Sequence, residues 1–225
     1  EIILHEEKGF LVVNKPSGLA VHGGSGVSFG LIELLRRHRE KKYETLELVH
    51  RIDKETSGII LIAKKRSILR TLHQYFRDGL IKKKYQALLL GNPVEMDFII
   101  DQPIRIDRSN KYRKSIIDPE GLKAITEFKM VKRFSHASLF EISPITGRTH
   151  QIRAHSAFIN MPIAGDIRYG IKNDIIKKSF GLKRLFLHAS EISFPQFDTS
   201  NSNYHFKADL SEELKAVLLN INSLD

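Results

Sequence analysis

A polar segment followed by an apolar run carries the clearest chemical signal in this sequence. His50, Arg51 and Asp53 precede residues 59–63, which are Ile-Ile-Leu-Ile-Ala and typical of a buried strand. The Asp53 carboxylate should therefore lie at the mouth of a rigid sheet, where catalytic groups are well held. Arg51 and Lys54 partly neutralise it, which favours the ionised form at neutral pH. Such a carboxylate is a candidate nucleophile or base. The alternative is a surface turn with an Arg51–Asp53 ion pair, which is the commoner arrangement for these residue types taken alone.

A second segment, Lys82-Lys83-Lys84-Tyr85, places an aromatic ring directly after three positive charges at the start of an expected strand. Aromatic faces stack on bases that have left a nucleic-acid helix, while nearby lysines hold phosphates. The alternative is a solvated basic turn with Tyr85 half-buried in the sheet.

The third segment, residues 143–153, contains Pro144 and Gly147, which predict a turn, and then the start of a helix. The first N–H groups of a helix favour anions. We expect His150 and Arg153, three residues apart, on one helical face. His150 and His155 are five residues apart, with no glutamate beside them as in zinc-binding helices, which argues against a metal site. The alternative is a helix cap followed by a solvated basic helix.

The composition bounds the class of protein. The chain has 225 residues and a formal net charge of +10, which favours a polyanionic partner such as RNA, DNA or an anionic membrane. It contains no cysteine and no apolar run of the roughly 20 residues that cross a bilayer. We therefore expect a cytoplasmic protein. Because the chain opens on Glu1 rather than methionine, we also expect a fragment or processed form.

Periodicity predicts an α+β fold with a mainly antiparallel mixed sheet flanked by helices and loops, in one domain over residues 1–225. The expected strands are 2–5, 10–13, 59–63, 85–90, 124–133 and 137–142, with a basic hairpin or long loop formed by 97–106 and 112–118. Helices are expected after a Ser28 cap, over 67–78, after Arg148 and over 211–220.

The three segments together resemble the signature motifs of the RluA-type family of pseudouridine synthases. That family has His-Arg-Leu-Asp-x-x-Thr-Ser-Gly before an apolar strand and Ala-Lys, and this chain differs only by Ile52 in place of leucine. Its Lys-Lys-x-Tyr and Thr-Gly-Arg-x-His-Gln-x-Arg patterns match residues 82–85 and 146–153. Weaker matches at 13–22 and 187–195 extend the resemblance over nearly the whole chain.

The resemblance implies an RNA uridine isomerase that needs neither cofactor nor metal. Asp53 would be the catalytic carboxylate, Tyr85 would lie beside the target uracil, and Arg153 would pair with Asp53. Arg51 would fill the stack that the flipped base vacates. Whether Asp53 attacks C1′, attacks C6 or removes a sugar proton stays open. The further candidates for substrate or RNA binding are His50, Lys82, Lys83, Lys84, Arg148 and His150.

The stretch from Val21 to Gly30 resembles a branch of the family that acts on large-subunit (23S) ribosomal RNA. Members of that branch carry an S4-like RNA-binding domain ahead of the catalytic domain, so we expect one to precede Glu1 in a longer, monomeric protein. Two alternatives stay open: a non-catalytic RNA-binding or ribosome-assembly module of the same fold, and a tRNA-directed pseudouridine synthase.

Overall fold

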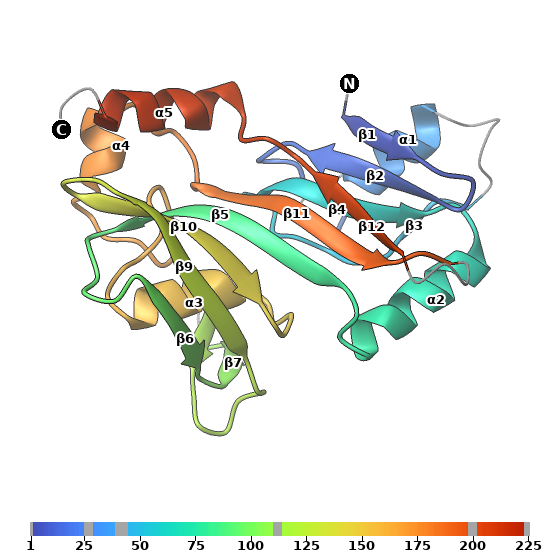
Figure 1. The fold of residues 1–225 in the computed structure, drawn as a ribbon, viewed down its shortest axis with the longest axis horizontal. Coiled ribbons are helices and arrows are strands. Elements are labelled where there is room, and N and C mark those ends of the chain that lie inside the picture. Colours follow the sequence, from blue (N-terminus) through green and yellow to red (C-terminus); the bar gives the residue numbers. More distant parts are fainter. Residues whose placement is uncertain (1, 25–28, 39–44, 110–113, 198–201, 223–225) are drawn as a thin grey trace. The chain divides into compact units, whose positions relative to one another are not determined.

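The chain folds into two compact units, which we describe separately. A computed structural model describes residues 2–24, 29–38, 45–109, 114–197 and 202–222. The first unit comprises Glu1–Lys83 and Ala189–Asp209, and the second comprises Lys84–His188 and Leu210–Asp225. The elements in chain order (Figure 1) are β1 (Ile3–Glu6), β2 (Phe10–Lys15), α1 (Leu31–His38), β3 (Glu47–Leu48), β4 (Ser57–Ala63), α2 (Arg66–Arg77), β5 (Lys82–Leu90), β6 (Asp97–Asp101), β7 (Ile104–Asp107), β8 (Lys114–Ile117), β9 (Ile125–Arg133), β10 (Ala137–Pro144), α3 (Gln151–Phe158), α4 (Ile175–Ser179), β11 (Leu187–Pro195), β12 (Asn203–Lys207) and α5 (Glu212–Asn222).

Strand β4 is the centre of the first unit. It pairs antiparallel with β2, in a register from Phe10 opposite Ala63 to Lys15 opposite Gly58. Alternate β4 side chains enter two cores: Ile59, Leu61 and Ala63 pack with Leu72 of α2, whereas Ile60 and Ile62 pack with the apolar face of α1. All seven residues of β4 are buried, which explains the continuous apolar run over residues 59–63.

The second unit is built on the antiparallel strand order β5, β10, β9, β6. Phe98, Phe128 and Phe140 from three of these strands pack together, with ring centroids 5.0 Å apart for the stacked Phe98–Phe128 pair. Helix α3 contributes Ala154 to a separate small core with Ile104 of β7. The α+β class and the mainly antiparallel pairing confirm the prediction from sequence.

One predicted hairpin arm is wrong. Residues 97–106 form two strands, because the chain breaks at Gln102-Pro103, where proline offers no N–H for a ladder. The first of these strands, β6, pairs with β9, and the second, β7, forms the expected hairpin with β8. The other expected strands and helices are present within a few residues of the predicted ends, while the Ser28 cap lies outside the described residues.

Among the helices of the described residues, none combines the length and apolar character that crossing a membrane would require.

Gly58 at the start of β4 tests this packing. Its φ of +110° suits glycine, and a Cβ built there would lie 2.2 Å from the Ala189 carbonyl oxygen. We expect Gly58→Ala to lower the free energy of unfolding by more than about 2 kcal/mol, because strain and overlap add. Gly79→Ala is the control, since Gly79 also has a positive φ of +67° but open space around it. Equal shifts of the denaturation midpoint in both variants would contradict this account.

Candidate active site

The Asp53 turn lies directly before β4 in the first unit. The Thr56 N–H donates to the Asp53 carbonyl oxygen at 3.2 Å and closes the turn. Ile52 is buried in the core beneath α1, whereas Arg51 is exposed and Asp53 is half-buried. The sequence therefore presents the carboxylate and the guanidinium at the mouth of β4, while the apolar residue between them anchors the segment.

A buried lysine fastens this turn to the end of β2. Lys15 is fully buried, and its Nζ donates to the carbonyl oxygens of Pro16, Leu19 and Lys54 at 2.9, 2.8 and 3.1 Å. The Ser17 hydroxyl donates to the Glu55 carbonyl oxygen at 2.6 Å. Sequence analysis gave this segment only as part of a weaker family match and assigned Lys15 no role, because lysine is seldom a buried residue.

His50 makes its described contacts inside the first unit. Its Nε2 accepts a hydrogen bond from the Leu61 N–H at 3.0 Å, and its ring lies 5.3 Å from that of Phe76. Burial, and secondarily the nearby Lys83 ammonium, lower the pKa of His50 to about 3. A neutral imidazole at physiological pH can hold the strand as an acceptor, but it cannot attract a phosphate as a cation.

The three predicted lysines before Tyr85 belong to β5, and their surroundings differ. Lys82 is exposed, whereas Lys83 is half-buried with its Nζ 5.7 Å from the Phe76 ring centre, and burial lowers the pKa of Lys83. Lys84 forms an ion pair of 3.0 Å with Glu141. Tyr85 is only 8% exposed and stands opposite Ile142 of β10, so the sheet restricts its ring.

The loop before α3 is held by the side chain of Gln151. Its Oε1 accepts hydrogen bonds from the Thr146 hydroxyl and the Arg148 N–H at 2.7 and 3.0 Å. The Arg148 side chain is exposed and its Nε donates to the Lys123 carbonyl oxygen at 3.0 Å. Side chains of Thr146, Gln151 and Arg148, all from the predicted motif, thus hold this loop through hydrogen bonds.

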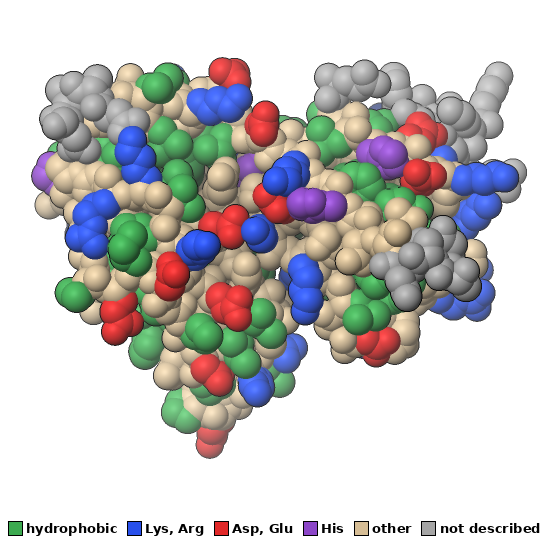
Figure 2. Space-filling model, viewed as in Figure 1, with side chains coloured by type: hydrophobic (Ala, Val, Ile, Leu, Met, Phe, Trp, Pro, Cys, Tyr) green, Lys and Arg blue, Asp and Glu red, His purple; other side chains and the backbone are tan. Residues whose placement is uncertain are grey.

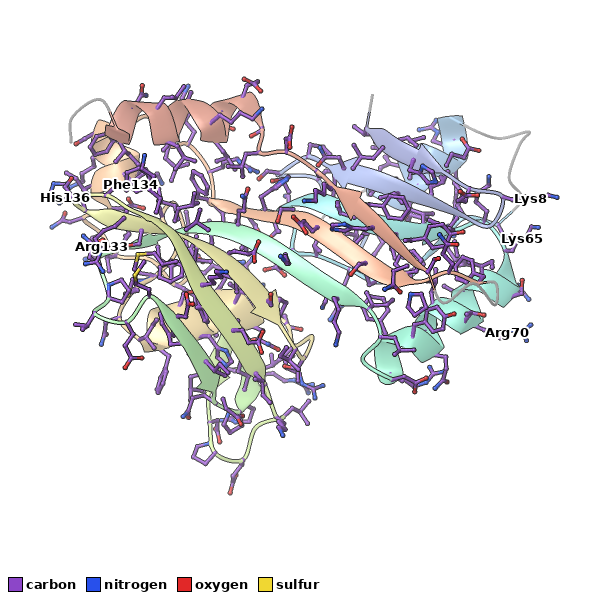
Figure 3. All side chains as sticks on the ribbon, in the orientation of Figure 1. Lys8, Lys65, Arg70, Arg133, Phe134 and His136 are labelled. Carbon is purple, nitrogen blue, oxygen red and sulfur yellow. The ribbon has the colours of Figure 1, made fainter. Side chains whose placement is uncertain are left out.

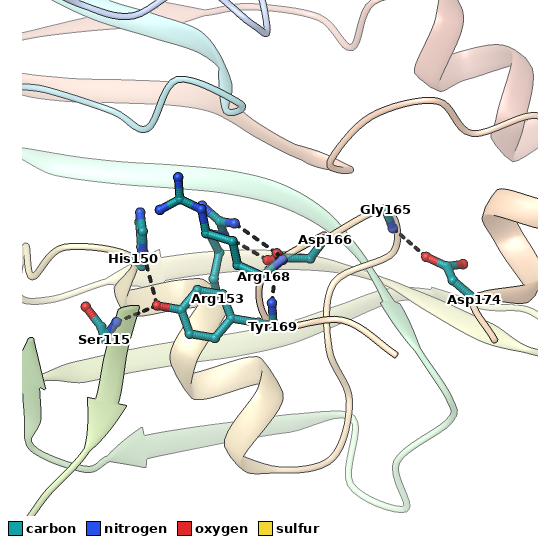
Figure 4. Close-up of polar contacts among 8 residues, drawn as sticks. All are labelled: Ser115, His150, Arg153, Gly165, Asp166, Arg168, Tyr169 and Asp174. Carbon is teal, nitrogen blue, oxygen red and sulfur yellow. Dashed lines mark hydrogen bonds and ion pairs between the residues drawn. The ribbon is translucent and has the colours of Figure 1, made fainter. Parts of the chain in front are cut away.

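Arg153 forms a buried, bidentate ion pair in the second unit. Its Nε and Nη2 donate to the two carboxylate oxygens of Asp166, each at 2.8 Å (Figure 4). Burial by itself would raise the pKa of Asp166, but hydrogen bonds and charge from Arg153, with the N–H groups of Arg168 and Tyr169, hold it below its ordinary value. A guanidinium has five N–H donors, and this pair uses two.

Tyr169 connects this ion pair to His150. Its ring lies 5.2 Å from the Arg153 guanidinium carbon, and its hydroxyl accepts from the Ser115 N–H at 2.6 Å and lies 3.0 Å from His150 Nδ1 (Figure 4). The prediction that His150 lies on the helical face of Arg153 is wrong, because His150 precedes α3 with a left-handed φ of 51°. Both side chains nevertheless meet at Tyr169.

A hollow in the second unit opens between the β7–β8 hairpin and the loop at Gly147. Its lining includes Arg105, Arg108 and Arg148. Arg105 donates to Asp118 at 2.6 Å, and this hydrogen bond and charge hold the pKa of Asp118 below its usual range. Guanidinium groups suit phosphate oxygens, so this hollow is a candidate contact for an RNA backbone beside the predicted motif.

The predicted residues thus fall into two groups. Asp53, Arg51, His50, Lys82 and Lys83 belong to the first unit, in which His50 and Lys83 both contact Phe76. The second unit holds Lys84, Tyr85, Arg148, His150 and Arg153. The expected pairing of Arg153 with Asp53 joins the two units and stays a prediction.

Sequence reasoning missed Asp166 and Tyr169 as well as Lys15. The only local signal is an acid and an aromatic residue flanked by Gly165 and Gly170. Among the described residues, no three histidine, aspartate or glutamate side chains gather closely enough to hold a metal ion.

The buried ion pair predicts a large effect of Asp166→Asn. The substitution leaves the guanidinium of Arg153 without this counter-charge, and breaking a buried pair in this way costs about 3–5 kcal/mol of unfolding free energy. Asp118→Asn removes the partner of an exposed arginine and should shift the denaturation midpoint far less, because water screens that pair. Equal shifts in the two variants would refute the structural importance of the Arg153–Asp166 pair.

Comparison with known proteins identifies close relatives. Residues 9–158 match the family model described as RNA pseudouridylate synthase. The chain is 45% identical over 224 residues to "Ribosomal large subunit pseudouridine synthase C" of Buchnera aphidicola subsp. Baizongia pistaciae, covering 98% of this chain and 70% of the relative. It is 43% identical to the protein of the same name from Vibrio parahaemolyticus, covering 98% and 69%. The solved structure of "Human RNA Pseudouridylate Synthase Domain Containing 4" superposes with a TM-score of 0.78 at 27% identity, covering 98% of this chain and 92% of that one.

Proposed function

This chain belongs to the RNA pseudouridylate synthase family, and on that basis we propose that it converts particular uridines of large-subunit (23S) ribosomal RNA to pseudouridine. The observation that carries the proposal is identity of 43–45% over 98% of the chain to relatives whose names state that activity. Retention of Asp53, Tyr85 and Arg153 in the matching motifs favours an enzyme over a binding module.

The reaction breaks the N1–C1′ bond of uridine and joins C1′ to C5 of the same uracil. The proton on C5 leaves and N1 gains one, so atoms and electrons balance without a co-reactant. The protein must therefore hold a carboxylate against the nucleotide and keep the detached uracil in place.

Asp53 supplies that carboxylate in the proposal. The Lys15 hydrogen bonds and the Gly58 contact support this role, because they fix the backbone on both sides of the turn. Arg51, exposed two residues before Asp53, would enter the RNA stack with its flat guanidinium when the target base leaves.

Tyr85 and Arg153 complete the proposed site from the second unit. Burial of Tyr85 in β5 restricts its ring, which suits a surface against which uracil stacks. The pair with Asp166 fixes the Arg153 guanidinium, and its fork of N–H donors suits the carboxylate of Asp53. We further propose that the protein acts as a cytoplasmic monomer.

Tritium release from [5-³H]uridine-labelled 23S rRNA tests the function, because the C5 hydrogen leaves only when the base is rejoined. We expect release by the parent chain and at least about a thousandfold slower release by Asp53→Asn, as for loss of a catalytic nucleophile or base. Asp78→Asn makes the same chemical change at an exposed position after α2 and should keep the parent rate.

Three results would contradict parts of the proposal. Parent-like release by Asp53→Asn would exclude Asp53 as the catalytic carboxylate. Release from tRNA but not from 23S rRNA would identify a tRNA-directed enzyme. RNA binding without release from either substrate would favour the non-catalytic module.

A further inference from the structure

The solvent face of α2 carries arginines, and the nearest carboxylate along the chain is that of its C-cap, Asp78. Helix α2 contains Arg66, Arg70 and Arg77 and neither aspartate nor glutamate. At 100° per residue, positions i, i+4 and i+11 fall within a stripe of about 40°, while Leu72 is buried on the opposite side. On the face drawn in Figure 2, basic side chains lie interspersed with acidic ones.

Lys8 and Lys65 extend the stripe beyond the start of α2. Lys8 lies in the turn between β1 and β2, and the Gly9 carbonyl of that turn accepts from the Lys64 N–H at 2.8 Å. A Cβ built on Gly9 would lie 2.7 Å from Cγ1 of Ile68, so the turn packs directly against the first turn of α2. Figure 3 shows Lys8, Lys65 and Arg70 along the same edge of the first unit.

The side chains of these cations make no hydrogen bond or ion pair within the described parts of the chain: Lys8, Lys65, Arg66 and Arg70. Neighbouring Lys64, in contrast, forms a 3.0 Å ion pair with Glu6. The N-cap, Lys65, makes no side-chain capping bond, and the first turn of α2 holds no acidic residue. Cations at a helix N-terminus oppose the helix dipole, so helix stability does not explain their placement.

The other end of α2 reaches the segment that carries the catalytic carboxylate. A ring nitrogen of His73 lies 3.1 Å from the Val49 carbonyl oxygen, and the Phe76 ring lies 5.3 Å from that of His50. Near this end Arg77 bonds to the neutral amide oxygen of Gln74 and keeps its charge. Helix α2, about 18 Å long at 1.5 Å per residue, thus runs from the Lys8–Lys65 cluster to the approach of Asp53.

We propose that Lys8, Lys65 and the arginine stripe of α2 form a track that binds the phosphate backbone of the substrate RNA beside the target nucleotide. A stacked DNA strand advances about 3.4 Å per nucleotide, so this track spans roughly five nucleotides. The contacts are to phosphates and carry no base specificity, hence the track aligns and retains the RNA while the Asp53 turn acts on it. This inference rests on the proposed function.

The test replaces the four cations without described partners in one variant, Lys8→Gln, Lys65→Gln, Arg66→Gln and Arg70→Gln. With full-length 23S rRNA we expect KM to rise at least tenfold while kcat at saturating RNA stays within twofold. The plot of log association constant for RNA against log[salt] should become shallower, its slope smaller in magnitude by about 3, because each lost phosphate contact on a single strand accounts for roughly 0.7. A minimal hairpin that carries the modified uridine but does not reach the track should be turned over as by the parent.

Two controls separate the track from net charge and from misfolding. Lys129→Gln, Lys132→Gln, Lys177→Gln and Lys183→Gln remove the same charge from exposed positions of the second unit and should leave KM nearly unchanged. A charge-keeping variant of the track, which combines K8R, K65R, R66K and R70K, should restore most of the affinity.

An unchanged KM and an unchanged salt slope in the fourfold Gln variant would contradict the proposed RNA track. This face would then be a candidate binding surface for another partner, such as an acidic protein. An equal loss in the second-unit control would also overturn the track, in favour of net charge alone. If the parent chain releases no tritium from any RNA, the proposed function itself fails, and that result is distinct from a failure of the track.

Discussion

The buried ammonium of Lys15 is the constraint on which the Asp53 turn, the proposed catalytic segment, depends. A lysine side chain without water must satisfy its charge inside the protein, and here it does so on three backbone carbonyls. One of these belongs to Lys54, directly after Asp53, so the end of β2 and the start of β4 are joined at the position of the carboxylate. The pairing of β2 with β4 and the close approach of Gly58 to Ala189 fix the same segment from the strand side. Such a turn holds its carboxylate in one orientation, as the proposed role of Asp53 requires.

The second unit uses a buried charge in a related way. Arg153 and Asp166 form a bidentate ion pair in which each side chain compensates the charge of the other. Tyr169, beside this pair, makes hydrogen bonds with Ser115 and His150. Either charge, buried at this depth without the other, would strongly destabilise the fold. Each unit therefore contains a buried cation beside its proposed site residues, whereas the cations proposed to meet RNA, including Arg51 and the α2 stripe, remain exposed. The cations that hold protein groups in place are thus buried, and the cations proposed to contact RNA are exposed.

Much of this arrangement could be predicted from local patterns. The apolar run over residues 59–63 of β4 indicates a strand that is buried on both faces. In α2, the spacing of Leu69, Leu72 and Phe76 indicates a helix that is buried on one face. The partners of the site could not be predicted in the same way. Arg153 and Asp166 are 13 residues apart across a loop, so no helical or strand period relates them. Lysine is a residue type expected at the surface, so burial of Lys15 could not be predicted. Residue type alone does not predict the left-handed backbone of His150 either.

The central claim, that buried Lys15 positions the Asp53 turn for chemistry, is tested most directly by Lys15→Met in single-turnover pseudouridine formation. Methionine keeps a long side chain but removes the donors to the three carbonyls. We predict a rate constant at least tenfold below that of the parent, with the Kd for RNA unchanged, which also shows that the variant is folded. Lys129→Met, which makes the same chemical change at an exposed position of the second unit, should retain the parent rate. A parent rate in Lys15→Met would contradict the account.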